Sequence, residues 1–235
     1  VRAKIRAQID DPALAEKLIP DSYGYGTYRV PLENGYYEAF NRSNVTLVDV
    51  KETPIERFSR NGLVVGSEEY PLDMVILATG FDAGTGSLAR MNITGRDGAS
   101  LAELWGRDIR STLGLQVHGF PNLFTVAGPL APSTAFCNMA TCLQQQVDWV
   151  TDAIVYLRDH HKHTMEPTAE REEAWVQHHD EVANSTLFMT VHSWYTGDNI
   201  EGKPRRLLSY IGGVGAYREI CEEERANDYP GFAVA

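Results

Sequence analysis

The segment 72–82 constrains the fold of this chain more than any other part of its sequence. Its middle, Met74 to Ala78, is an uninterrupted apolar run, which is typical of a strand buried on both faces of a parallel sheet. Thr79 and Gly80 follow at once. Because glycine has no Cβ, the backbone at Gly80 can turn sharply and approach a bound molecule closely. We therefore predict a buried strand that ends in a ligand-binding turn.

Composition narrows the possible partners and the cellular compartment. A chain of 235 residues, 43% of them hydrophobic, is long enough for one large domain or two small ones. Its formal net charge of −11 argues against nucleic acid and against a membrane as partners, because both bind clustered basic residues. No apolar run approaches the ~20 residues that span a bilayer. The three cysteines, Cys137, Cys142 and Cys221, show no C-x-x-C spacing, so we expect free thiols and a reducing cytoplasm.

Hydrophobic periodicity and turn residues predict the elements. Helices are expected over 1–8, 12–18, 36–41, 101–105, 138–161, 167–183 and 217–226. Strands are expected over 45–50, 55–58, 63–65, 69–72, 74–78 and 123–127, the second to fourth forming a meander. Residues 187–206 are expected to form a long loop.

Five segments, in this order along the chain, resemble the Baeyer–Villiger monooxygenases, flavoproteins of the phenylacetone and cyclohexanone monooxygenase type. They are GTYRVPL at 26–32, YYEAFNRSNV at 36–45, ATGFDA at 78–83, PNLF with GP at 121–129, and SWYTG with GKPR at 193–205. The family's two glycine-rich phosphate-binding turns and its FxGxxxHxxxWP fingerprint do not occur here. GTGSLA at 84–89 and GGVG at 212–215 lack the strand, helix and glycine context of such turns. The resemblance therefore implies the C-terminal portion of such an enzyme.

The resemblance also implies the fold class and the domains. We expect an α/β chain, the C-terminal part of a two-dinucleotide-binding-domain (FAD/NADP, Rossmann-like) flavoprotein with an added helical layer. Residues 1–80 would be the C-terminal part of the NADP-binding domain. Residues 81–235 would be the C-terminal part of the FAD-binding domain, with the helical layer and a lid loop. The missing N-terminal part of the same enzyme would be the partner, and the chain would be inactive alone.

The activity implied is the insertion of one oxygen from O2 next to a ketone carbonyl, giving an ester or lactone. In the family this reaction proceeds through a C4a-peroxyflavin, with FAD as cofactor and NADPH as reductant. Arg29, by its place in GTxR, aligns with the family's catalytic arginine. A guanidinium stays protonated at any working pH and donates in a planar fork, so it suits the stabilisation of anions.

Further site residues follow from the same resemblance. Expected cofactor-binding residues are Tyr28, Thr79, Gly80, Asp82, Asn138, Met139, Trp194 and Lys203. The expected substrate pocket is Ser133, Thr134, Ala135, Phe136 and Cys137, small and apolar enough for a ketone of moderate bulk. Tyr28 stands where relatives often carry a lysine for the 2′-phosphate of NADPH, so the choice between NADPH and NADH stays open.

Two other classes of function remain open from the sequence. One is a flavin-dependent N- or S-oxygenating monooxygenase, which shares the two-domain plan. The other is a catalytically inactive fragment or assembly module. An FxGxxxHxxxWP segment upstream would favour ketone oxidation over both. A metal site is not expected, because the histidines at 160–163 and 178–179 lie in polar stretches without a ligand motif such as HExxH.

Overall fold

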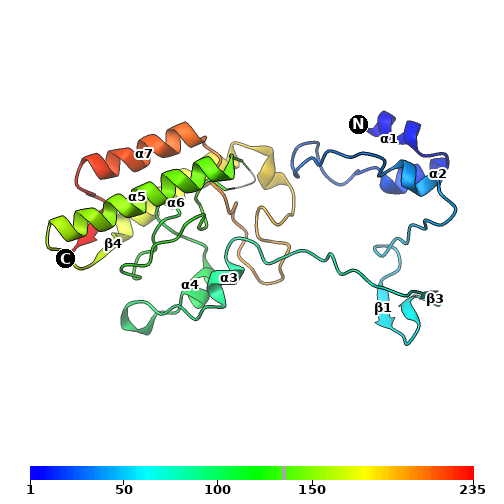
Figure 1. Ribbon diagram of the computed structural model, residues 1–235, viewed down its shortest axis with the longest axis horizontal. Coiled ribbons are helices and arrows are strands. Elements are labelled where there is room, and N and C mark those ends of the chain that lie inside the picture. Colours follow the sequence, from blue (N-terminus) through cyan, green and yellow to red (C-terminus); the bar gives the residue numbers. More distant parts are fainter. Residues whose placement is uncertain (134–135) are drawn as a thin grey trace. The chain divides into compact units, whose positions relative to one another are not determined.

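The computed structural model describes residues 1–133 and 136–235, which form two compact units (Figure 1). The first unit comprises Val1–Tyr25 and Val30–Phe81. The second comprises Gly26–Arg29 and Asp82–Ala235. The chain thus enters the second unit for four residues, returns to the first, and crosses again after Phe81.

The first unit opens with two short helices, α1 (Arg2–Gln8) and α2 (Pro12–Leu18). Asp11 caps α2 by accepting the N–H of Ala13 at 2.8 Å, and Pro12 occupies the first turn, where a proline lacks no needed donor. Both helices are confirmed as predicted. Their apolar faces form a small core with Ile5, Ile9, Ala15 and Ile19 buried.

A 3-10 turn, η1 (Glu38–Asn41), leads to the predicted meander. Strands β1 (Ile55–Phe58), β2 (Gly62–Val65) and β3 (Glu68–Pro71) pair antiparallel in that order. Gly62 lies so close to β3 that a Cβ there would stand 1.9 Å from the carbonyl oxygen of Tyr70. A residue with a side chain would therefore separate β2 from β3.

The predicted strands 45–50, 74–78 and 123–127 are wrong for this structure. All three ranges are free of strand assignments. In the middle one, Met74, Ile76 and Leu77 are 75%, 82% and 72% exposed. A strand needs a neighbour to accept its hydrogen bonds, and none of the residues described here provides one for 74–78. The apolar run has strand composition but lacks its sheet.

Most of the regular secondary structure in the second unit is helical. Its helices are α3 (Gly86–Ala89), η2 (Arg96–Gly98), α4 (Leu101–Arg107), α5 (Met139–Asp159), α6 (Ala169–Asn184), η3 (Leu187–Thr190) and α7 (Val214–Ala226). Helices α5 and α7 lie side by side (Figure 1), over a core that includes Trp149, Trp175, Tyr217 and Tyr229. No helix in the described part of the chain is long and apolar enough to cross a bilayer.

Two details of this unit differ from expectation. Helix α6 begins at Ala169 rather than at Pro167, because Thr168 is its N-cap and accepts the N–H of Arg171 at 3.1 Å. Pro167 instead ends a short strand, β4 (Met165–Pro167), which pairs antiparallel with β5 (Phe232–Val234). Strands of three residues show too little alternation to be found from sequence.

Candidate functional site

Four aromatic rings from two distant segments form a cluster in the second unit. Phe136 precedes α5, whereas Phe188, Trp194 and Tyr195 belong to the long loop 187–206. The ring of Phe136 lies 4.9 Å from that of Phe188 and 5.5 Å from that of Tyr195. The ring centroids of Trp194 and Tyr195 are 4.1 Å apart. The structure therefore brings Phe136, predicted for the substrate pocket, next to the loop that carries the cofactor candidate Trp194.

The segment Gly26–Arg29 reaches the same loop. The hydroxyl of Tyr28 donates a hydrogen bond to the carbonyl of His192, two residues before Trp194. The pKa of Tyr195 is raised, because burial outweighs the opposing effects of the Arg29 charge and of a hydrogen bond from its backbone. Tyr28 and Arg29 thus lie beside the aromatic cluster.

The Arg29 side chain is exposed. Within the described residues no ion pair involves it, and Glu33, four residues further along the chain, pairs with Lys4 at 3.6 Å. A guanidinium without a carboxylate keeps its capacity to bind an anion. This is the arrangement that an anion-stabilising arginine needs.

Two of the predicted cofactor-binding residues bind each other. The ammonium group of Lys203 lies 2.6 Å from a carboxylate oxygen of Asp82 and 2.7 Å from the carbonyl of Ala83. Only 8% of the Lys203 side chain is exposed. The pair therefore fastens the far end of the loop 187–206 to the segment that follows Gly80.

Thr79 and Gly80 belong to the first unit, and both are exposed. Gly80 has a φ of +90°, a conformation that favours glycine, and a Cβ placed there would have no atom within 4 Å. The backbone at Gly80 is open to the close approach of a ligand. Its conformation is one that favours glycine, as the sequence predicted.

The N-terminus of α5 presents unused donors. Asn138 caps the helix: its side chain accepts the N–H of Thr141 at 3.5 Å, and its carbonyl accepts that of Cys142 at 3.0 Å. The N–H groups of Met139 and Ala140 come before the first intrahelical bond and have no acceptor among the described residues. With the dipole of a 21-residue helix, they form a site that favours negative charge.

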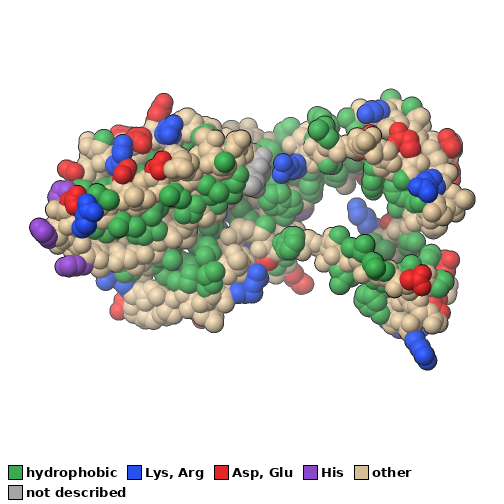
Figure 2. All heavy atoms as spheres, viewed as in Figure 1, with side chains coloured by type: hydrophobic (Ala, Val, Ile, Leu, Met, Phe, Trp, Pro, Cys, Tyr) green, Lys and Arg blue, Asp and Glu red, His purple; other side chains and the backbone are tan. Residues whose placement is uncertain are grey.

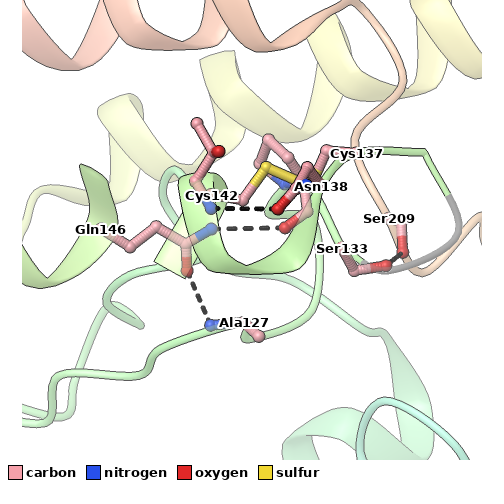
Figure 3. Close-up of a disulfide and its surroundings, with 9 residues drawn as sticks. Ala127, Ser133, Cys137, Asn138, Cys142, Gln146 and Ser209 are labelled. Carbon is pink, nitrogen blue, oxygen red and sulfur yellow. Dashed lines mark hydrogen bonds between the residues drawn. A yellow bond between two sulfur atoms is a disulfide. The ribbon is translucent and has the colours of Figure 1, made fainter. Parts of the chain in front are cut away.

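The loop before α5 is held firmly at its start. Gln146 is fully buried; its carbonyl accepts the N–H of Ala127 at 2.7 Å and its amide donates to the carbonyl of Pro132 at 3.3 Å (Figure 3). Ser133, predicted for the substrate pocket, shares a hydrogen bond with Ser209. Thr134 and Ala135, predicted for the same pocket, lie outside the described residues.

The expectation of free thiols at Cys137 and Cys142 is wrong. Their sulfur atoms are joined in a disulfide, with the Cα atoms 6.7 Å apart (Figure 3). Cys137 precedes the N-cap Asn138, and Cys142 lies on the buried side of α5, so the turn at the start of the helix brings them together. The C-x-x-C test could not detect a pair at this spacing. Cys221 is a free buried thiol, and burial raises its pKa to about 12, so it is a poor nucleophile.

Sequence reasoning missed Phe188, Tyr195 and Asp198. Tyr195 stands inside the SWYTG segment and was available as a signal. Asp198 directly follows the SWYTG segment and binds the side chains of His192 and Arg205. Across the part of the chain that the structure covers, no group of three or more His, Cys, Asp or Glu residues could hold a metal ion.

Comparison with known proteins first defines the class. A solved structure described as OTEMO complexed with FAD and NADP matches all of this chain, at 40% identity and a TM-score of 0.93, over 43% of its own length. The fold is that of part of a two-dinucleotide-binding flavoprotein, as predicted. No family model matches the sequence.

Curated relatives then define the family. Acetone monooxygenase (methyl acetate-forming) of Gordonia sp. (strain TY-5) is 56% identical over 236 residues, which is 100% of this chain and 44% of the relative. Phenazine N-monooxygenase PhzNO1 of Lysobacter antibioticus is 40% identical over 99% of this chain and 42% of its own length. The chain belongs to the Baeyer–Villiger monooxygenase family. It spans less than half the length of these relatives.

Proposed function

We propose that this chain forms part of an FAD- and NADPH-dependent enzyme that inserts one oxygen atom from O2 next to the carbonyl of a small ketone, giving an ester or lactone. The observation that carries the proposal is the relation over the whole chain, at 56% identity, to an enzyme named for forming methyl acetate from acetone. The site in the second unit supplies groups suited to that chemistry.

Arg29 is proposed as the catalytic residue. Its guanidinium is free of described carboxylates, and its charge acts on Tyr195 of the aromatic cluster. A positive charge beside the reacting atoms stabilises an anion that develops there. Arg29 would hold the negative charge that develops on oxygen during insertion.

The donor set at the start of α5 fits a flavin. The N–H groups of Met139 and Ala140, beside the Asn138 cap, would stabilise an anionic ring edge. When bound and reduced, the flavin would supply the electrons that activate O2. Cys137, Phe136 and the loop residues 133–135 would border the ketone.

The remaining candidates would bind the nicotinamide cofactor. Trp194 offers a flat face and one N–H donor, and it is 39% exposed, so it is accessible to a ligand. Tyr28 would act by holding the loop through His192 rather than by meeting a phosphate with charge. Thr79, Gly80 and the Asp82–Lys203 pair would shape the backbone around the cofactors.

Residues 1–80 would complete the NADP-binding domain and residues 81–235 the FAD-binding domain, together with an N-terminal part of the same enzyme. The two compact units, which meet in sequence between Phe81 and Asp82, support this assignment.

We also place the enzyme in the cytoplasm. The Cys137–Cys142 disulfide argues the other way, because disulfides are rare in reducing compartments. Thiol counting on freshly isolated enzyme would test this: free thiols at Cys137 and Cys142 would support the cytoplasm.

Replacement of Arg29 tests the proposal. In the complete enzyme, Arg29→Ala should lower ester formation at least ~100-fold, about 3 kcal/mol, because one preorganised charge is lost. Arg29→Lys should rescue little, since a point charge replaces a planar fork. The measurement is product formation by gas chromatography alongside NADPH oxidation.

The matched control is Arg60→Ala, which removes an exposed arginine from the turn between β1 and β2. It should leave ester formation unchanged. Ester formation by Arg29→Ala at the wild-type rate would remove Arg29 from the mechanism.

N-oxygenation is a second candidate, because phenazine N-monooxygenase is 40% identical to this chain. The two candidates differ in their substrates. If the wild-type enzyme oxidises a phenazine but no ketone in a panel that includes acetone and cyclohexanone, N-oxygenation is the correct function.

A further inference from the structure

Asp198 is the hydrogen-bonding centre of the loop 187–206. One of its carboxylate oxygens accepts the N–H of Ser193 at 2.9 Å and the hydroxyl of Thr196 at 2.7 Å. The other lies 2.7 Å from a ring nitrogen of His192 and 2.7 Å from the Nε of Arg205. Both oxygens are therefore fully used, and only 11% of the side chain is exposed.

These contacts enclose the turn that carries Trp194. Ser193 and Thr196 flank Trp194 and Tyr195, so the carboxylate ties together the two ends of a four-residue turn. The turn also holds itself: the N–H of Thr196 donates to the carbonyl of Ser193 at 3.1 Å, and the N–H of Tyr195 donates to the Ser193 hydroxyl at 3.2 Å. Asp198 adds two bonds to this set, one at each end of the turn that carries Trp194.

The same carboxylate connects the turn to the base of the loop. Arg205, paired with Asp198, also donates to the carbonyls of Met189 at 2.6 Å and Val191 at 3.1 Å. The backbone carbonyl of His192, the other side-chain partner of Asp198, accepts the hydrogen bond from the Tyr28 hydroxyl. Asp198 therefore joins the start and the end of the loop to the segment that carries Arg29.

The charge state of Asp198 suits this task. Burial acts to raise its pKa, but hydrogen bonds from Thr196, Ser193, His192 and Arg205 outweigh that effect, and its pKa is lowered. The carboxylate is ionised throughout the neutral range and accepts charge-assisted bonds, which are stronger than neutral ones.

We propose that Asp198 is the positioning residue for Trp194, holding its indole in place to close over the nicotinamide cofactor. The cofactor role of Trp194 rests on the proposed function; the anchoring role of Asp198 rests on the contacts above. Loss of the carboxylate would leave the fold intact but would let the indole sample other directions, weakening cofactor binding and admitting water.

Steady-state kinetics of the complete FAD-loaded enzyme test this role. Asp198→Asn should raise the KM for NADPH about tenfold, since a charge-assisted bond is typically worth a factor of that size. It should also increase the share of NADPH oxidised to peroxide without product, with a smaller change in kcat. Thr196→Val, which removes one donor from the carboxylate, should shift both quantities in the same direction by less.

Glu201→Gln is the matched control, because it neutralises an exposed carboxylate on the same loop. It should leave KM, coupling and melting temperature unchanged. Wild-type KM and coupling in Asp198→Asn would overturn the proposal. A loss of FAD content and melting temperature in that variant, with wild-type kinetics in Thr196→Val, would reduce Asp198 to a folding role.

A readout without catalysis separates this proposal from the proposed function. Trp105, Trp149 and Trp175 are buried, whereas Trp194 is 39% exposed. Iodide quenching that disappears in a Trp194→Phe background therefore reports on Trp194. Quenching should increase in Asp198→Asn even if the wild-type enzyme oxidises no ketone. Equal quenching in the two proteins would contradict the anchoring.

Discussion

Arg206 illustrates how single charged residues position the long loop. Its guanidinium binds the carboxylate of Asp180 on α6 through two nitrogens, each at 3.0 Å, and donates to Asp108 and to the carbonyl of Ile109 at 2.6 Å. One side chain thus joins the end of the loop, α6 and the residue after α4. Bidentate pairs of this kind specify geometry as well as energy.

The Asp180–Arg206 pair predicts a pH dependence. Burial acts to raise the pKa of Asp180, but bonds from His179 and Arg206 outweigh it and the pKa is lowered from 3.8. A lowered folded-state pKa gives stability that is present above the unfolded value and lost as the pH falls through the folded value. Asp180→Asn should therefore cost about 1 kcal/mol at pH 7, after allowance for solvent screening.

Thermal melts of wild type and Asp180→Asn between pH 7 and pH 3 measure this difference. It should stay constant down to about pH 5 and shrink below the ordinary aspartate value. Glu181→Gln, which alters an exposed neighbour on α6, should melt like wild type at every pH. A difference between wild type and Asp180→Asn that grows on acidification would contradict the assigned sign.

At the scale of elements, the sequence predicted those whose signals are local. The Asp11-Pro12 start, the meander around Gly62 and the periodicity of α5 each depend on neighbours within a few residues, and each is confirmed. The strand at 74–78 failed because pairing depends on a partner distant in sequence. Sequence patterns did not reveal the three-residue strands β4 and β5 or the Cys137–Cys142 bond. Neither a very short strand nor a single disulfide leaves a periodic pattern.

The same holds for the candidate site. Resemblance placed Arg29, Tyr28, Phe136 and Trp194 on the list, and the structure brings them to one region of the second unit. Composition gave no reason to select Asp198, since its importance lies in four contacts that only the folded loop creates.

Hydrogen exchange tests the explanation for the missing strand. If 74–78 joins a sheet supplied by the rest of the enzyme, the amides of Val75, Ile76 and Leu77 should exchange slowly in the complete enzyme and rapidly in the 235-residue chain. The amides of β2 should be similarly protected in both. Rapid exchange at 75–77 in the complete enzyme would mean that the run is not a strand there.

At the scale of the whole molecule, many large apolar side chains are exposed. Besides 74–78, Val147 and Ile154 on α5 are 44% and 52% exposed, and Figure 2 shows hydrophobic side chains across the surface of the second unit. Contiguous apolar surface commonly marks a contact face. The relatives matched here are more than twice as long as this chain.

The chain alone should not retain FAD. It holds the helix N-terminus of α5 but no glycine-rich turn for a pyrophosphate, and one donor cluster does not bind a dinucleotide tightly. Flavin absorbance after gel filtration of the 235-residue chain with added FAD measures this. The complete enzyme serves as the positive control, and stoichiometric flavin on the short chain would show that its FAD site is built differently.

The excursion of Gly26–Arg29 into the second unit matters for anyone who recombines these enzymes. A crossover placed between Phe81 and Asp82, where the chain finally changes unit, would pair the loop 187–206 of one parent with the Tyr28 and Arg29 of another. The hydrogen bond from Tyr28 to His192 would then join residues of different ancestry. Functional chimeras should be built by transferring residues 26–29 together with 82–235, so that both segments come from the same parent.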